Sequence, residues 1–359
     1  MEQYRIVVIN PGSTSTKVSY YENDKEVVNE NLFHPTESLE KYARVSDQYD
    51  YRLAIILDFL KAHDIDVTKL DAVVGRGGML PPVDAGAYFV NDEMIEWLTN
   101  RADIDHASNL GAVLANGIRN QAKADCIAMI YDPITVDQFW DLSRVSGLKG
   151  VKRRSIGHML NMRSVALQTA EQMNKPYEDL NLIVVHLGSG SSISAHYQGR
   201  MVDLILDDEG PFSVERSGGL SLKELIPMCY EMSEEDITVL TRKKGGMISY
   251  LNTNSGIEVE ERIENGDEEA AYILEAMAYQ VAKGIGSAAT VLSGKVDGIV
   301  ITGGLAYSER LTDWVKERVS FIGNVIVSPG ENEMYALAMG ANRILTGDEV
   351  GHTFSLPEA

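Results

Sequence analysis

A strand–turn–strand unit that occurs twice, near the start and near the middle of the chain, constrains the fold more than any other feature. Each copy has an apolar strand, a small polar turn and a second strand, at 6–9, 10–16 and 18–21 and again at 182–185, 186–192 and 193–197. One constant offset pairs Gly12 with Gly188, Ser13 with Ser189, Ser15 with Ser191 and Tyr21 with Tyr197. Because 359 residues also exceed the usual length of one domain, the repeat predicts a duplicated α/β domain.

The two turns have the composition of anion-binding loops. Glycine lets the backbone come close to a ligand, serine and threonine add hydroxyl donors, and consecutive N–H groups in such a turn attract negative charge. The pair of turns predicts a polyphosphate site, whereas each turn alone is also compatible with an ordinary serine-rich hairpin. The candidate phosphate-binding residues are Gly12, Ser13 and Ser15 in the first turn and Gly188, Ser189, Gly190 and Ser191 in the second.

The remaining sequence alternates helical and strand patterns. Apolar residues recur at helical spacing in some segments, and short β-branched runs mark further strands. The predicted helices span 51–63, 111–124, 159–173, 268–292 and 332–345, and the predicted strands span 71–75, 126–131 and 296–302. The predicted class is therefore mixed α/β.

Polar residues or glycines directly follow several predicted strands. Arg76, Asp132 and His186 each stand at a strand end, and Gly303 with Gly304 ends another strand. In α/β sheets ligands bind beyond the carboxyl ends of the strands, so we expect these residues to gather there. They are residue types that phosphoryl transfer uses. Each also has a plain structural alternative: a surface cation, a turn former before proline, or a core histidine.

Two further segments carry charged residues that are candidates for binding a phosphate, a carboxylate or a metal. Arg216 lies in a glycine-rich loop, where its planar fork can bind a phosphate or a carboxylate. Glu331 and Glu333 precede the last predicted helix, and either is a candidate metal ligand, directly or through water. The alternative for both is a favourable acidic first turn of that helix.

The formal net charge of −21 limits the possible partners. A nucleic-acid-binding protein normally carries a basic patch, so we expect no nucleic acid. The compact basic cluster of the chain is equally compatible with a solvated surface, and it consists of Lys149, Lys152, Arg153 and Arg154. Because the overall charge repels ATP, a phosphate site must rely on local dipoles, a metal and a few placed cations.

The sequence predicts a cytoplasmic location. No run of about 18 apolar residues suggests a membrane helix, and the chain opens with a charged residue and a strand instead of a signal peptide. Cys126 and Cys229 lie far apart, which excludes a disulfide framework, and both are expected to be buried thiols.

At these residues the chain resembles the acetate/butyrate kinase family, also called the acetokinase family. The motifs that carry the resemblance are VVINPGSTSTK at 7–17, GRGG at 75–78, YDP at 131–133, RRSIGH at 153–158, HLGSG at 186–190, RSGG at 216–219, ITGG at 301–304 and ENE at 331–333. The resemblance implies two duplicated actin/hexokinase-like (ribonuclease H-like) domains with an interdomain cleft, and a homo-oligomer. It places the first domain at 1–150, completed by the C-terminal helix 331–359, and the second at 151–330.

The resemblance also implies roles for single residues. Asn10 would support Mg²⁺ and phosphate, Asp132 would position substrate or metal, and Glu331 or Glu333 would be linked to the metal. Arg76 and Arg216 would flank the substrate carboxylate and the moving phosphoryl group. The remaining family positions are His158 and His186 at the phosphoryl oxygens, and Gly188, Ser189, Gly190, Ser191, Gly303, Gly304 and Leu305 around ATP or ADP.

Three departures from the acetate kinase pattern resemble butyrate and branched-chain fatty acid kinases instead. Pro11 stands in the first turn where acetate kinases have alanine, Asn161 replaces the second histidine of a later motif, and Pro133 follows Asp132. The resemblance therefore implies reversible, direct in-line transfer of the γ-phosphoryl group of ATP to butyrate or a branched short-chain acid, giving an acyl phosphate and ADP. The alternatives are an acetate or propionate kinase, a non-metabolic actin-like ATPase, and a sugar kinase.

Overall fold

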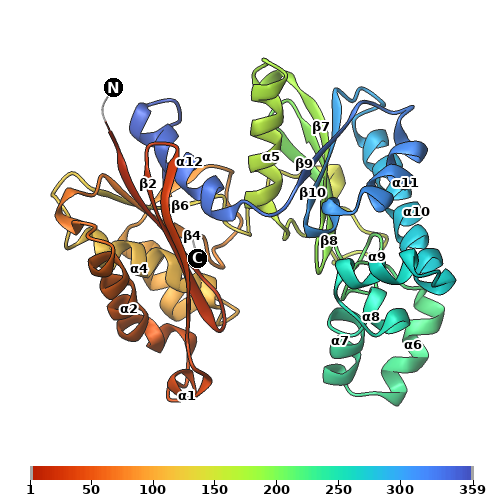
Figure 1. Cartoon of the computed structure of the whole chain (residues 1–359), viewed down its shortest axis with the longest axis horizontal. Helices are drawn as coiled ribbons and strands as arrows, with labels where there is room; N and C mark the ends of the chain where they lie inside the picture. Colours follow the sequence, from red (N-terminus) through yellow and green to blue (C-terminus); the bar gives the residue numbers. More distant parts are fainter. Residues whose placement is uncertain (1–2, 357–359) are drawn as a thin grey trace. The chain divides into compact units, whose positions relative to one another are not determined.

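The computed structural model describes residues 3–356 (Figure 1). These residues divide into two compact units, each built on its own β-sheet. The first unit comprises the described parts of Met1–Asp137 and of Asn332–Ala359, and the second comprises Gln138–Glu331. No helix within 3–356 is both long enough and apolar enough to cross a bilayer.

The sheet of the first unit has the strand order β12-β5-β6-β4-β1-β2-β3. Its strands are β1 (Arg5–Pro11), β2 (Ser15–Glu22), β3 (Lys25–Phe33), β4 (Ala72–Arg76), β5 (Ala87–Phe89), β6 (Ile127–Tyr131) and β12 (His352–Thr353). Strands β1, β2 and β3 form an antiparallel meander, and β4 and β6 extend the sheet in parallel from β1. The helices are α1 (Thr36–Leu39), α2 (Tyr49–Ala62), α3 (Asp92–Glu96), α4 (Leu110–Arg119) and α12 (Glu333–Thr346).

Helices cover both faces of this sheet (Figure 1). Successive side chains of a strand point to opposite faces, and β1 is apolar on both. Val7 and Ile9 pack in one core with α2 and α4. Ile6 and Val8 are equally buried on the other face, where α12 contacts β1 and β4. The last long helix of the chain therefore closes the core that the first strand begins.

The second unit repeats this layered arrangement around the order β11-β10-β7-β8-β9. Its strands are β7 (Asn181–Leu187), β8 (Ser191–Tyr197), β9 (Arg200–Ile205), β10 (Gly298–Gly303) and β11 (Val325–Pro329). Its helices are α5 (Met159–Gln172), α6 (Leu222–Glu231), α7 (Glu234–Arg242), α8 (Gly246–Leu251), α9 (Gly256–Glu264), α10 (Glu268–Val291) and α11 (Glu309–Val319). Helix α5 lies on one face of the sheet, and α10 packs its apolar stripe on the other (Figure 1).

The two sheets share one topology, which confirms the predicted duplicated α/β class. In each, an antiparallel meander is extended in parallel from its first strand: β4 pairs with β1, and β10 pairs with β7. Each meander also has a register shift between its second and third strands, at Tyr20/Tyr21 and at Ala195/His196. The repeat in the sequence is therefore a repeat of structure.

Most predicted helices and strands are confirmed to within one or two residues at either end. The helix predicted for 111–124 is an exception, because α4 ends at Arg119. Beyond it the chain turns so that Lys123 pairs with Asp71 at 2.5 Å before β6 begins.

The expectation that both cysteines are buried is half wrong: Cys126 is buried, but Cys229 is exposed because α6 buries none of its residues.

A close approach of helix and strand sets the end of β4. A Cβ atom on Gly75 would lie 2.2 Å from the carbonyl oxygen of Gly111 in α4, and one on Gly111 would lie 2.1 Å from the carbonyl oxygen of Arg76. Only glycine at both positions lets α4 pack this tightly against the strand. The contact thereby fixes the backbone from which the Arg76 side chain extends.

We expect Gly111→Ala to destabilise the first unit by about 1–3 kcal/mol, because the new methyl group meets backbone that cannot move independently. The matched control is Gly286→Ala in α10, where nothing lies within 4 Å of the added atom. Removing that helical glycine should be neutral or stabilise by roughly 0.5–1 kcal/mol. Urea unfolding followed by circular dichroism measures both effects, and equal midpoints for the two variants would contradict the packing argument.

Candidate functional site

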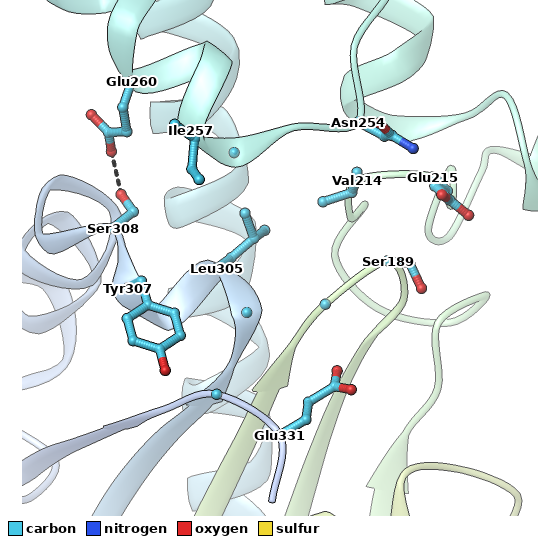
Figure 2. Close-up of a pocket in the computed structure, with 14 residues that line it drawn as sticks. Ser189, Val214, Glu215, Asn254, Ile257, Glu260, Leu305, Tyr307, Ser308 and Glu331 are labelled. Atoms are coloured by element: carbon cyan, nitrogen blue, oxygen red, sulfur yellow. Dashed lines mark hydrogen bonds between the residues drawn. The ribbon is translucent and has the colours of Figure 1, made fainter. Parts of the chain in front are cut away.

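A pocket of about 770 Å³ opens at the carboxyl ends of the strands of the second unit (Figure 2). Its walls come from the segments that follow β7, β10 and β11, together with the start of α9 and residues 214–215. Strands β7, β10 and β11 are parallel, so their ends meet at one edge of the sheet. The predicted residues that line the pocket are Gly188, Ser189, Gly304, Leu305 and Glu331.

The pocket has an apolar side and a polar side. Figure 2 shows Ile257, Leu305 and Tyr307 on one side and Ser189 with Glu331 on the other. A pocket of this volume with mixed walls suits a small molecule that has an apolar part and a polar part.

The carboxylate of Glu260 lines the pocket next to its apolar side. Glu260 of α9 accepts hydrogen bonds from the Ser308 hydroxyl and from Nε of Arg310, the latter at 2.9 Å. Since both carboxylate oxygens have partners, the side chain is held in one orientation. The sequence did not predict that Glu260 lines a pocket, because a glutamate on a polar helix looks like any other exposed surface residue.

The turn after β10 depends on one glycine. Gly303 has a φ of 94°, and a Cβ atom there would lie 2.3 Å from the carbonyl oxygen of Leu187. The left-handed backbone and the lack of space both require glycine. As a result the turn at Gly304 and Leu305 is brought against the end of β7, where the glycine-serine turn starts.

The glycine-serine turn at 188–191 is held from below. The amide of Gly188 donates to the carbonyl oxygen of Gly190 at 3.0 Å, and the carbonyl of Ser189 accepts from the Ser213 hydroxyl at 2.5 Å. Ser189 is exposed, whereas Ser191 is fully buried. Within the described residues the Ser191 hydroxyl has no hydrogen-bond partner. The turn therefore presents Ser189, not Ser191, to the pocket.

Two predicted histidines stack beside this turn. His186, at the end of β7 and 1% exposed, lies with its ring centre 4.0 Å from that of His158, with an angle of 19° between the planes. Asn161 of α5 places its amide nitrogen 2.9 Å from Nδ1 of His186. Nε2 of His186 lies 3.2 Å from a carboxylate oxygen of Glu331. Glu331 thus joins the histidine pair to the pocket wall.

Arg216 lies next to the same turn and is held by acidic residues. Its Nε is 3.2 Å from Asp207, and its Nη1 is 3.3 Å from Glu215 and also donates to the carbonyl oxygen of Arg242. A Cβ atom on Gly190 would lie 3.8 Å from Cγ of Arg216, which places the arginine beside the turn. Asp207 is thus a positioning partner that the sequence did not reveal.

The first unit gathers its predicted residues at the equivalent sheet edge. Glu333, in the first turn of α12, accepts from the amide nitrogen of Asn10 at 2.7 Å and pairs with Arg76 at 2.5 Å. His106 lies close enough that burial, and then the positive charge of Arg76, lower its pKa. Asn10, Arg76 and Glu333 therefore form one cluster, whereas Glu331 belongs to the second unit.

Asp132 lies at the end of the neighbouring strand β6 and is buried. Its φ is 40°, a left-handed conformation that aspartate tolerates better than most residues. Its Oδ1 accepts from the amide of Gly86 at 2.7 Å. Asp132 thus forms the turn that was its structural alternative, and its role toward substrate or metal stays a prediction.

The turn at 12–15 follows β1. The amide of Gly12 donates to the carbonyl oxygen of Ser15 at 2.8 Å, and Ser13 is exposed. Below the turn lies Arg52 of α2, which was not predicted because its segment reads as an ordinary amphipathic helix. Its carbonyl partners are Gly12, Ser13 and Ser15.

Comparison with known proteins identifies the family of the chain. The model of the acetokinase family matches residues 147–346, more than half of the chain. The chain belongs to the acetokinase family. This confirms the family that the motifs of the sequence resemble.

Solved structures of related proteins confirm the fold. Acetate kinase from Porphyromonas gingivalis superposes with a TM-score of 0.78 at 20% identity, covering 95% of this chain and 100% of that one. Acetate kinase from Entamoeba histolytica gives 0.77 at 15% identity, with 96% and 100% covered. A propionate kinase from Francisella tularensis subsp. tularensis gives 0.74 at 17% identity, with 94% and 98% covered.

Proposed function

We propose that this chain is a short-chain fatty acid kinase that transfers the γ-phosphoryl group of ATP to butyrate or a branched acid of similar size, giving an acyl phosphate and ADP. The observation that carries the proposal is the pocket lined by 188–189 and 304–305, which lies at the strand ends of a chain that belongs to the acetokinase family. The cytoplasmic location, the homo-oligomeric state and the domain limits remain predictions from the family resemblance.

In this proposal the pocket of the second unit binds the nucleotide. The apolar side formed by Ile257, Leu305 and Tyr307 would contact the base. The exposed Ser189 and the glycines around it would meet the phosphates, because backbone N–H groups in such a turn attract anions. Gly303 and Gly304 would set the distance between the base and the phosphates of the bound nucleotide.

The reaction requires charge neutralisation more than proton transfer. A short carboxylic acid has a pKa of about 4.3, as a glutamate side chain does, so at neutral pH it is already an anion and needs no general base. The barrier arises because this anion must approach the anionic γ-phosphate. Arg76, Arg216, His158 and His186 are the side chains that would balance this charge and align the groups for direct in-line transfer.

Magnesium is the expected metal, since it accompanies ATP in phosphoryl transfer and shields the charge of its phosphates. It keeps several waters and takes only one or two carboxylates from the protein. Within the described residues no group of three or more His, Cys, Asp or Glu side chains is arranged to hold a metal. The Asn10–Glu333 pair offers one amide and one carboxylate, which fits an ion held largely by phosphate and water. Asp132 and Glu331 are the other candidate metal ligands.

The choice of butyrate over acetate depends on the sequence. Pro11, Asn161 and Pro133 depart from the acetate kinase pattern in the direction of butyrate and branched-chain acid kinases. The similar solved structures include an acetate kinase and a propionate kinase. They support a shorter acid as the substrate as much as the sequence departures support butyrate. Acetate or propionate kinase activity is therefore the second candidate.

A substrate panel tests the proposal. The purified chain, ATP and Mg²⁺ are incubated with acetate, propionate, butyrate or isobutyrate, and the acyl phosphate is trapped with hydroxylamine. One methylene in an apolar pocket changes the barrier by about 1–3 kcal/mol, so kcat/KM for the best C4 acid should exceed that for acetate at least about tenfold. A preference for acetate or propionate would select the second candidate. Absence of hydroxamate from every acid would refute the carboxylate kinase proposal.

We expect Arg216→Ala to lower kcat by about 10³ or more, the scale of a positioned arginine in phosphoryl transfer. Asp207 keeps a partner in this variant, because Nη2 of Arg242 lies 3.3 Å from it, so the loop should stay folded. Arg242→Ala is the matched control, since it removes the other arginine on the same carboxylate, and it should retain most activity. Near-full activity in a folded Arg216→Ala protein would remove Arg216 from the mechanism.

Two neighbouring glutamates allow the metal role to be assigned. Because Glu333 lies with Asn10 and Glu331 lies with His186, Glu333→Gln should raise the Mg²⁺ concentration for half-maximal rate about tenfold. Glu331→Gln should leave that concentration nearly unchanged and alter KM for ATP instead. Titration of Mg²⁺ at saturating ATP measures the difference, and the reverse pattern would move the metal to Glu331.

A further inference from the structure

Arg52 is a fully buried arginine directly below the turn at 12–15. Its side chain extends from α2 and is 0% exposed. Nη1 donates to the carbonyl oxygens of Gly12 at 2.9 Å and Ser15 at 3.2 Å, and Nη2 donates to that of Ser13 at 3.3 Å. One guanidinium group thus binds three carbonyls of the same turn.

These contacts determine which way the peptide groups of the turn point. In a planar trans peptide the C=O and N–H bonds point in opposite directions. Because the carbonyls of Gly12 and Ser13 face Arg52, the N–H groups of Ser13 and Thr14 face away from it. Both residues are exposed, and no described group accepts either N–H. The turn therefore presents two free donors on its outer side.

Among the residues that the structure describes, the guanidinium group also lacks a counter-ion. Within the described residues no carboxylate lies within 4.0 Å of it, and its side-chain partners are the neutral Gln48 and Thr16. Thr16 is in turn 2.8 Å from Nε2 of His34, which stays neutral because burial, and then the charge of Arg52, lower its pKa to about 4. Burial lowers the pKa of Arg52 to about 10, which leaves it charged at neutral pH.

We propose that Arg52 is a positioning residue for phosphate binding: it turns the carbonyls of 12–15 inward, aims the N–H groups of Ser13 and Thr14 outward, and adds a buried positive charge behind them. It touches no substrate itself. Its role rests on the proposed kinase function together with the phosphate-binding role that the sequence predicts for Gly12, Ser13 and Ser15 in this turn.

A buried arginine elsewhere in a protein usually has a carboxylate partner, because an isolated charge in the interior is costly. A carboxylate in place of Gln48 would stabilise the charged form of Arg52, but it would also neutralise the positive potential that Arg52 creates at the turn. Arg76 and Arg216 show the opposite arrangement, since each has an acidic partner. The absence of such a partner at Arg52 is what favours a role toward an anion over a purely structural one.

Substitution of Arg52, with two readouts, tests the proposal. Arg52→Gln keeps hydrogen-bond donors but removes the charge, and Arg52→Lys keeps the charge but not the fork. We expect Arg52→Gln to weaken the binding of inorganic pyrophosphate, measured by calorimetry on the full chain, by about tenfold or more, since charge-assisted hydrogen bonds depend on this geometry. Arg52→Lys should fall between Arg52→Gln and the unsubstituted chain. In kinetics, KM for ATP should rise more than kcat falls.

Chemical rescue separates positioning from general stability. In Arg52→Ala, millimolar guanidinium chloride should fill the vacated space and restore both pyrophosphate binding and KM, whereas urea at equal concentration should not. The matched control is Arg343→Ala, which removes a partly buried arginine of the same unit that binds Tyr131 and Glu349 instead of the turn. It should lower thermal stability without changing pyrophosphate affinity.

The outcomes distinguish the two proposals. If folded Arg52→Gln binds pyrophosphate as tightly as the unsubstituted chain, the role of Arg52 is refuted even where fatty acids are phosphorylated. If Arg52→Gln is unfolded, failure of guanidinium to rescue Arg52→Ala refutes it. If pyrophosphate binding depends on Arg52 but no acid is phosphorylated, the positioning role holds and the kinase proposal fails.

Discussion

Parallel pairing between the first strand of each meander and the next strand of its sheet is the constraint on which the rest of this structure depends. In the first unit Ile9 pairs with Gly75 and Arg76 pairs with Tyr131, so Asn10, Arg76 and Asp132 leave the sheet at nearly the same level. In the second unit Thr302 pairs with His186, which places the turn after β10 beside the turn after β7. Residues far apart in sequence thereby reach one edge without any long loop having to carry them there.

The arginines at these sheet edges are held in two different ways, which matters for the proposed binding of an anionic ligand by an acidic protein. Arg76 and Arg216 are held by carboxylates, so their geometry is fixed while much of their charge is balanced. Arg52 is held by backbone carbonyls and by the neutral side chains of Gln48 and Thr16, so within residues 3–356 no carboxylate balances its charge. In the proposed function the paired arginines would supply directed hydrogen bonds to the ligand, and Arg52 would supply an electrostatic field from inside the fold.

Sequence patterns predicted the layers of the fold and most of the polar residues at the strand ends, because both follow from local periodicity and from where strands stop. They did not predict α6–α9, since those short helices carry polar residues and few buried ones; the exposed Cys229 belongs to this part. Two buried or half-buried partners of the predicted site residues were also not predicted, namely Arg52 and Asp207, and Asn161 was noted only as a departure from a family motif. Their partners lie in separate elements, so no local pattern connects them, and Glu331 could not be told from Glu333 until α12 was placed.

The return of the chain to its first sheet has a consequence for biosynthesis. The second unit is continuous in sequence, so everything it needs leaves the ribosome before the final helix does. The α12 face of β1 and β4 in the first unit stays uncovered until the second unit has been synthesised and Gly340 can pack against Tyr131. The first unit is therefore begun before the second and completed after it, and Glu333, whose carboxylate binds Asn10 and Arg76, is synthesised with the completing helix. A truncated or stalled chain would hold a finished second unit and an open, apolar first one, which is a state that chaperones and proteases recognise.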